Sequence, residues 1–421
     1  MQRAIILSLT AACSLAACKQ GSNGTGSTAA GETSTSTSGD GDGDGDGDGD
    51  GDGDGEPEPA EFCDLTGVER LAPEWLVQEV GPVEPGGEWL SAIATGEDAL
   101  YFTSRTRDLA PPNQELAATL ERRDLSGAPI WRVELDDPKA WLGELIVDEA
   151  HVYALDDAGV RRWTLAGERD EWAIEAGEEP IDLAVTDTVA LLENFSTLEA
   201  SWTEIDTYPK LAPADPLDTR RLEAGPEGEL LGTALAASPW GGWMFAAIEV
   251  PAEGEVVARL AHLPKGVGVE GPLAVPDRLP LVRTLASDGE ALILAGTRYL
   301  VGKALWVARV TQAAEGPAID GPIRDHELCD RGGGAIQAIV DHGERLWVFG
   351  TVEVGPAPHG QAWVLLELDY AGELVHRWTI DLGEGDWALH SFARTDEGTF
   401  VGGRHRRDDG VDERVLARLP L

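Results

Sequence analysis

Cysteine and basic residues are both scarce in this sequence, and long apolar runs are missing. The 421 residues include four cysteines, too few for a small domain built on dense disulfides. Lysine and arginine number 32 against 76 aspartates and glutamates, so the net charge is −44. Residues 61–421 alone carry 65 acidic and 30 basic side chains, and such a chain repels nucleic acid. The hydrophobic share of 42% excludes disorder throughout.

The first 18 residues have the layout of an export signal. Arg3 supplies a positive charge, and residues 4–17 are apolar or small, a stretch too short to span a bilayer. Leu15-Ala16-Ala17-Cys18 resembles the lipobox of bacterial lipoproteins, which implies removal of residues 1–17 and acylation of Cys18. By the same resemblance, Lys19 favours the outer membrane, with the body exposed to the periplasm or the cell surface. The alternative is an ordinary signal peptide in which Cys18 is incidental.

Small and acidic residues dominate residues 18–60, where glycine alternates with aspartate from residue 39 to residue 55. Such a segment has nothing to bury, so we expect a disordered linker. The alternation matches the start of a calcium-binding loop. It lacks the final glutamate ligand and the flanking helices, so no metal site is expected.

From residue 61 onward, short β-type runs recur with a regular period. Each unit starts with two apolar runs separated by a turn, and consecutive turns lie 39 to 55 residues apart. The residues that mark these turns are Asp98, Asp148, Asp187, Ser238, Asp288, Asp341 and Asp396. This period is typical of a four-stranded propeller blade. The sequence therefore predicts an all-β, seven-bladed β-propeller. Two stacked β-sandwiches are the alternative.

Local motifs resemble known propeller repeats. Residues 123–131 (Arg-Asp-Leu-Ser-Gly-Ala-Pro-Ile-Trp) look like the turn of PQQ-type repeats. Hairpins that end in residues 294–296 (Leu-Ala-Gly) or 401–403 (Val-Gly-Gly) are similar to kelch-type repeats. These resemblances imply architecture and carry no catalytic residue.

The two ends of the chain complement each other. The last unit stops after its third predicted strand, residues 415–419, whereas residues 74–80 carry a fourth-strand pattern with no unit of their own. We expect this segment, with Trp75 and Val77, to complete the last blade and close the ring, which hides two sheet edges. Residues 61–421 then form one domain.

Two cysteines remain in the exported body once Cys18 is acylated. Cys63 precedes the closing strand, and Cys329 lies in the connection that enters the sixth unit. A Cys63–Cys329 disulfide is the natural expectation in an oxidising compartment, and it would clamp the ring. Two buried free thiols are the alternative.

Catalytic motifs are hard to find. The eight histidines form no metal-binding pair, and residues 266–271 match a dinucleotide-binding glycine pattern without the helix that it requires. His151 and His390 fall in or beside predicted inner strands, where a structural role is expected. No catalytic residue, cofactor or metal is assigned.

The sequence favours a monomeric, lipid-anchored propeller that binds a protein or a glycan without catalysis. The alternatives are an enzyme, either a quinoprotein-like oxidoreductase or a glycan hydrolase or lyase, and a scaffold for outer-membrane assembly. An acidic face would favour basic partners and salt-sensitive association.

Overall fold

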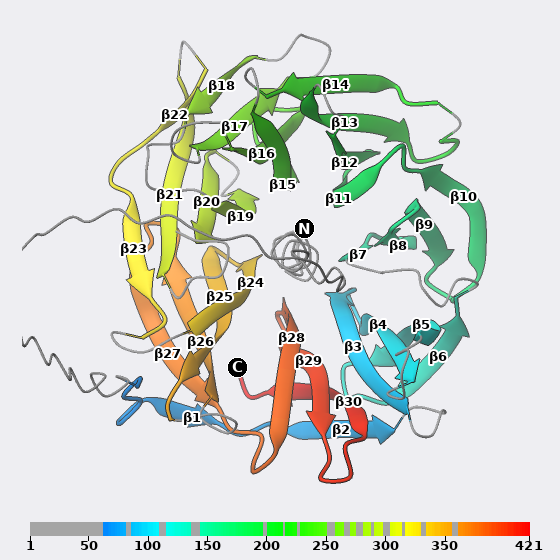
Figure 1. Cartoon of the computed structure of the whole chain (residues 1–421), viewed down its shortest axis with the longest axis vertical. Coiled ribbons are helices and arrows are strands. Elements are labelled where there is room, and N and C mark those ends of the chain that lie inside the picture. The colour runs from blue at the N-terminus through cyan, green and yellow to red at the C-terminus, as the bar shows by residue number, and fades with distance from the viewer. Residues whose placement is uncertain are drawn as a thin grey trace, which may run out of the picture.

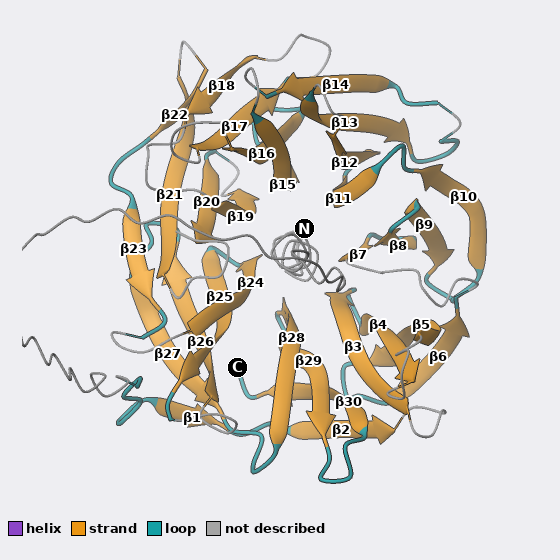
Figure 2. Ribbon diagram, in the orientation of Figure 1, coloured by secondary structure: helices purple, strands orange, loops and turns teal. Residues whose placement is uncertain are grey.

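The computed structural model is an all-β ring. It describes residues 62–80, 86–108, 115–135, 144–196, 200–213, 215–224, 228–250, 257–264, 270–274, 281–287, 290–297, 304–313, 316–329, 334–355 and 361–421. Seven sheets are arranged in a ring around a central axis, so the predicted seven-bladed propeller is confirmed (Figure 1). Strands and their connections make up the described part of the chain (Figure 2). No helix within it is long and apolar enough to cross a bilayer. The signal segment and the linker lie outside the described residues.

Each blade is built outward from the axis by hairpins. The innermost strands of blades 1 to 7 are β3 (Gly86–Thr95), β7 (Glu144–Val147), β11 (Glu179–Val185), β15 (Glu229–Ala237), β19 (Leu281–Ser287), β24 (Gly334–His342) and β28 (Asp386–Thr395). The second strands are β4 (Ala99–Asp108), β8 (His151–Asp156), β12 (Thr188–Ser196), β16 (Trp243–Val250), β20 (Leu292–Thr297), β25 (Arg345–Glu353) and β29 (Gly398–Arg406). Turns rich in aspartate, serine and glycine join these two strands, as their turn chemistry predicts.

The outer half of each blade repeats the same antiparallel arrangement. The third strands are β5 (Glu115–Asp124), β9 (Gly159–Thr164), β13 (Ser201–Pro209), β17 (Val257–Leu263), β21 (Ala304–Ala313), β26 (Gln361–Asp369) and β30 (Asp412–Leu419). The outermost strands are β6 (Pro129–Glu134), β10 (Arg169–Glu175), β14 (Asp218–Glu223), β18 (Glu270–Ala274), the pair β22 (Gly316–Ile319) and β23 (Arg324–Glu327), β27 (Leu374–Ile380) and β2 (Trp75–Val80).

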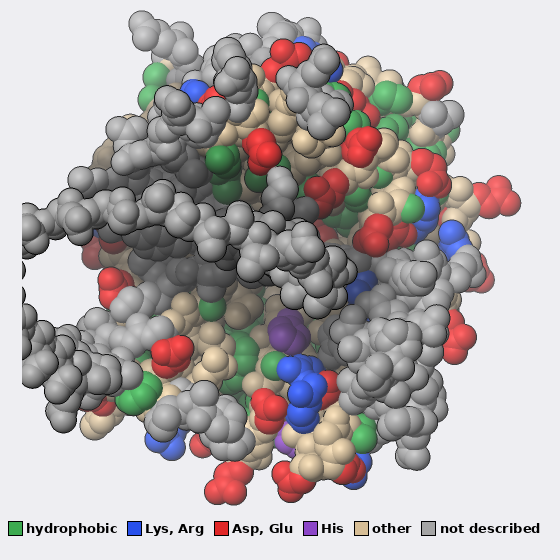
Figure 3. All heavy atoms as spheres, in the orientation of Figure 1, with side chains coloured by type: hydrophobic (Ala, Val, Ile, Leu, Met, Phe, Trp, Pro, Cys, Tyr) green, Lys and Arg blue, Asp and Glu red, His purple; other side chains and the backbone are tan. Residues whose placement is uncertain are grey.

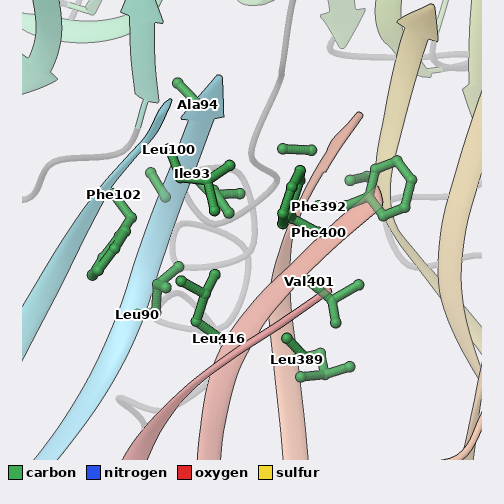
Figure 4. Close-up of a cluster of buried hydrophobic side chains, with 14 of the residues drawn as sticks. Leu90, Ile93, Ala94, Leu100, Phe102, Leu389, Phe392, Phe400, Val401 and Leu416 are labelled. Atoms are coloured by element: carbon green, nitrogen blue, oxygen red, sulfur yellow. The ribbon is translucent and has the colours of Figure 1, made fainter. Parts of the chain in front are cut away.

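The apolar core lies between neighbouring blades. Leu90 of β3 and Leu416 of β30 face one another between blades 1 and 7, with Phe400 and Phe392 nearby (Figure 4). Gly402 permits this approach, because a Cβ there would lie 2.7 Å from a methyl group of Leu90. Apolar side chains from both faces of each sheet therefore fill the wedges between blades.

The N-terminal segment contributes a strand to each of two neighbouring blades. Trp75 and Val77 lie in β2, which pairs antiparallel with β30, opposite Arg418 and Leu416 respectively. The short strand β1 (Glu69–Leu71) was not predicted. It adds a fifth, parallel strand to blade 6 by pairing with β27. The chain thus extends blade 6 before it completes blade 7.

The expected disulfide is confirmed. Cys63 and Cys329 are bonded and buried, and the Cys63 amide donates to the carbonyl of Glu353 at 2.7 Å. The bridge joins the start of the N-terminal segment to the connection between blades 5 and 6. It therefore fixes this segment at a second place, away from the blade that β2 completes.

Buried ion pairs join β2 and β30 to blade 1. Nη1 of Arg414 lies 3.2 Å from Oε1 of Glu88 and 2.9 Å from Oε2 of Glu121, and Nη2 contacts Glu79 on β2. Arg123 also bridges Glu79 and Glu121, at 2.7 and 2.6 Å. Burial would lower the pKa of Arg414, but the surrounding carboxylates raise it above its usual range. We call these five residues the closure network.

Candidate functional site

The turns that join the first and second strands of the blades all lie at one end of the ring's central axis. Nε2 of His342, the last residue of β24 in blade 6, lies 3.1 Å from Oδ1 of Asp396 in the blade 7 turn. Nε1 of Trp240, in the blade 4 turn, donates to the carbonyl of Glu290 in blade 5 at 3.0 Å. These two contacts link blade 6 to blade 7 and blade 4 to blade 5 at this end of the ring, which we call the turn face.

The turn face carries exposed carboxylates in six of the seven blades. In blades 1, 2, 3, 5, 6 and 7, the turns carry the exposed acidic residues Glu97, Asp98, Glu149, Asp187, Glu290, Glu344, Asp396 and Glu397. We call this set the acidic rim. Two nearby cations are already paired: Arg122 with Asp98 at 2.9 Å, and Lys210 with Asp148 at 2.8 Å. The rim therefore presents negative charge on rigid turns around the axis.

Figure 3 shows one face of the ring. Acidic side chains are spread over its outer parts, and some basic side chains lie nearer its centre. This distribution agrees with the net charge of −44 for the whole chain. Surface charge of one sign attracts partners of the opposite charge, and added salt weakens this attraction by screening it.

Two buried carboxyl groups face each other where the innermost strands of blades 2 and 3 meet. Glu144 and Asp182 are 4% and 1% exposed. Asp182 follows a β-bulge in β11 and accepts the amide of Leu235, in the innermost strand of blade 4, at 2.6 Å. The amide of Leu183 lies 2.7 Å from Oδ1 of Asp182 and 3.2 Å from Oε2 of Glu144. The pair thus connects three consecutive blades beside the axis.

This pair retains a proton at mildly acidic pH. Burial, together with the charge of Asp182, raises the pKa of Glu144 well above its usual range. Burial also raises the pKa of Asp182 to about 6, despite the hydrogen bonds that stabilise its ionised form. A shift of that size corresponds to roughly 3 kcal/mol between the two protonation states. Full ionisation of both groups therefore opposes the folded ring.

Glu144→Gln is expected to change how stability depends on pH. Because the pKa values are raised, the folded chain binds these protons more tightly than the unfolded chain does. The contribution of the pair is therefore greatest below about pH 4 and declines as pH rises through the folded pKa values. Glutamine keeps a neutral side chain of the same shape, so the variant should gain about 1–3 kcal/mol over the wild type between about pH 5 and pH 8. Thermal unfolding across this range measures the gain.

The matched control is Glu178→Gln, which neutralises an exposed glutamate just before β11. It should leave the pH profile unchanged. An offset of Glu144→Gln that is the same at every pH would mean that Glu144 does not titrate in this range.

The two histidines singled out in the sequence both have pKa values lowered by their surroundings. Burial and the charge of Arg162 lower the pKa of His151, which lies 3.8 Å from Asp148. His390 is the extra residue of a β-bulge in β28, where burial and the nearby Arg404 lower its pKa to about 4. No group of three or more metal-ligating side chains occurs within the described ranges.

Other predicted features fall partly or wholly outside the described residues. Cys18 and the glycine–aspartate alternation lie there, as do residues 266–269 of the glycine pattern. The Glu144–Asp182 pair was missed, although the sequence carries a signal for it. In two consecutive units, an acidic residue directly precedes the apolar run of the innermost strand.

No family model and no curated protein match this chain. Among solved structures, it is similar to the WD40 domain of Pan2 from Neurospora crassa, at 11% identity and a TM-score of 0.42, over 82% of this chain and 96% of that one. A protein from Lactobacillus plantarum is 14% identical, with a TM-score of 0.45, over 81% of this chain and 96% of that one. Hsv2 from Kluyveromyces lactis is 11% identical, with a TM-score of 0.41, over 79% and 99%. The fold assignment rests on the strand topology and not on these likenesses.

Proposed function

We propose that this chain is a lipid-anchored propeller of the outer membrane that binds a basic protein partner through the acidic rim, without catalysing a reaction. The observation that carries the proposal is the rim itself: exposed carboxylates in the turns of six blades around one end of the ring. Turns on a rigid scaffold are where recognition residues concentrate. Their negative charge favours lysine- and arginine-rich protein surfaces over a neutral glycan.

The proposed location is supported by two features at the N-terminal end. The sequence around Cys18 resembles a lipobox, and a linker of small and acidic residues separates it from the ring. The disulfide between Cys63 and Cys329 is typical of proteins that mature in an oxidising compartment. An intact mass showing an acylated Cys18 as the first residue of the mature protein supports the anchor. An unmodified Cys18 in the mature protein contradicts it.

Neutralising the rim is expected to weaken binding of a basic probe. The variant combines Glu97→Gln, Glu149→Gln, Asp187→Asn, Glu344→Gln and Glu397→Gln, all at exposed positions. Because these changes remove five negative charges from one face, affinity for a lysine-rich peptide at low salt should fall at least about tenfold. Titration calorimetry at low and moderate salt measures the effect, and added salt should weaken wild-type binding as well.

A matched control carries the same number of neutral substitutions away from the turn face. It replaces the exposed residues Glu134, Glu178, Glu384, Asp386 and Asp408 with their amides. Both proteins then have the same net charge, so only the position of the charge differs. Equal loss of affinity in the two variants would show that net charge, and not the rim, attracts the probe.

A further inference from the structure

A loop beside the acidic rim exposes two leucines. The connection between the third and fourth strands of blade 3 is described at residues 210–213 and 215–217, and Leu211 and Leu217 are 95% and 63% exposed there. Isolated exposed leucines are ordinary on protein surfaces. These two share one short connection with the exposed residues Ala212 and Pro216. We call this connection the leucine loop.

The base of the leucine loop is held firmly. The backbone carbonyl of Lys210 accepts a hydrogen bond from Nη1 of Arg162 at 2.5 Å. The side-chain ammonium group of Lys210 pairs with Asp148 at 2.8 Å. At the other end, the amide of Leu217 donates to the carbonyl of Thr207 at 2.6 Å. Both ends are thus fixed while the leucine side chains face solvent. A contact presented in this way costs little conformational entropy on binding.

The loop stands among carboxylates. Lys210 contacts Asp148, the neighbour of the rim residue Glu149 in the blade 2 turn. Pro209, just before the loop, pairs with Thr188, the neighbour of the rim residue Asp187. Asp215 adds an exposed carboxylate within the loop itself. The charge of Lys210 is balanced by Asp148, so the leucines are bordered by net negative charge.

Exposed leucines bordered by carboxylates favour one kind of binding partner over others. A second copy of the chain would bring another −44 charges to the same place, which opposes self-association. An anionic bilayer would be repelled by the same carboxylates. A protein segment with an apolar side flanked by lysine and arginine satisfies both the leucines and the acidic residues around them.

We propose that the leucine loop is the apolar contact through which the acidic rim takes up a basic, amphipathic segment of a partner protein. This inference rests on the proposed function and assigns its anchor to blades 2 and 3. Leu211 and Leu217 pack against the apolar side of the segment. Glu149, Asp187 and Asp215 pair with its basic side chains, so neither part alone accounts for the full affinity.

The test uses two synthetic probes of equal charge and the full-length protein. One peptide places leucines on one side of a lysine-rich helix, and the other has serine in place of every leucine. The leucine peptide should bind at least about tenfold more tightly. Leu211→Ser combined with Leu217→Ser should remove that difference. The matched control, Ile130→Ser combined with Leu374→Ser at residues 50% and 42% exposed on outer strands, should preserve it.

The outcomes separate this inference from the proposed function. If both peptides bind equally and the rim variant weakens both, the rim binds partners but the leucine loop does not. If neither peptide binds, both proposals fail. If the loop variant instead loses binding to vesicles of phosphatidylethanolamine and phosphatidylglycerol, and peptide binding is unchanged, the occupant is lipid and the inference is overturned.

Discussion

Replacing Arg414 with methionine is expected to lower the free energy of unfolding by about 3–5 kcal/mol. Arg414 is almost fully buried and supplies positive charge to Glu88 and Glu121, which are 1% and 2% exposed. Methionine fills a similar volume but has no positive charge, so the two buried carboxylates lose the ion pairs that offset their removal from water. Removing one partner of a buried ion pair costs much more than the pair itself contributes. Urea unfolding followed by tryptophan fluorescence measures the loss.

Arg418→Met is the control for this prediction. It makes the same substitution on the same strand, at the surface pair of Arg418 and Glu74, where the side chains are 26% and 45% exposed. An exposed pair of this kind contributes less than about 1 kcal/mol. If the two variants unfold at the same urea concentration, the closure network does not stabilise the ring.

The second large effect is expected from the disulfide. Replacing both Cys63 and Cys329 with alanine should destabilise the protein by up to about 5 kcal/mol, because the bond encloses a loop of 266 residues and restricts the unfolded chain. Alanine keeps the two buried positions apolar, so no polar group is buried in exchange. The urea midpoint of the double variant, compared with that of the oxidised wild type, measures the loss.

Reduction of the wild type provides the matched comparison. Once reduced, it should unfold close to the double variant, and the single variant Cys63→Ala should do the same because either change removes the bond. Unchanged midpoints in all three would show that strand pairing and the closure network hold the N-terminal segment without help from the bond.

The fold could be predicted because its signals are local and repeat. Apolar runs separated by turns at Asp98, Asp148 and Asp396 mark the hairpins wherever they occur. The period between them fits one blade. The closing strand was visible for a related reason, since residues 74–80 repeat a pattern found in the fourth strands. Strand β1 was not visible, because three residues that add in parallel to a finished blade carry no pattern of their own.

The contacts of the buried charged residues could not be predicted as well from the sequence, because they form between different blades. Arg414 and Glu88 lie 326 residues apart in the sequence. Only the closed ring brings them together. The Glu144–Asp182 pair depends in the same way on two inner strands and on the β-bulge that precedes Asp182. Three residues of the acidic rim, Asp98, Asp187 and Asp396, were predicted as turn residues. The arrangement of the rim around one end of the axis follows from the ring.

Carboxylates thus have three different roles in this molecule. On the acidic rim they are exposed on the turns of the blades. In the closure network they are buried and paired, and arginine hydrogen bonds lower the pKa of Glu79 despite its partial burial. At Glu144 and Asp182 they are buried together without a cation, so burial and mutual repulsion keep a proton on the pair. Their surroundings determine whether charge recruits a ligand, stabilises the ring or opposes it.

Amide hydrogen exchange of β2 tests most directly whether the N-terminal segment is an integral part of the ring. β2 is the edge strand of blade 7, so alternate amides in residues 75–80 donate to β30. These amides should be protected to the same extent as the amides of residues 412–419, because both then exchange only when blade 7 opens. Rapid exchange of residues 75–80 beside a protected β30 would show that the last blade has three strands and that the ring closes without its N-terminal strand.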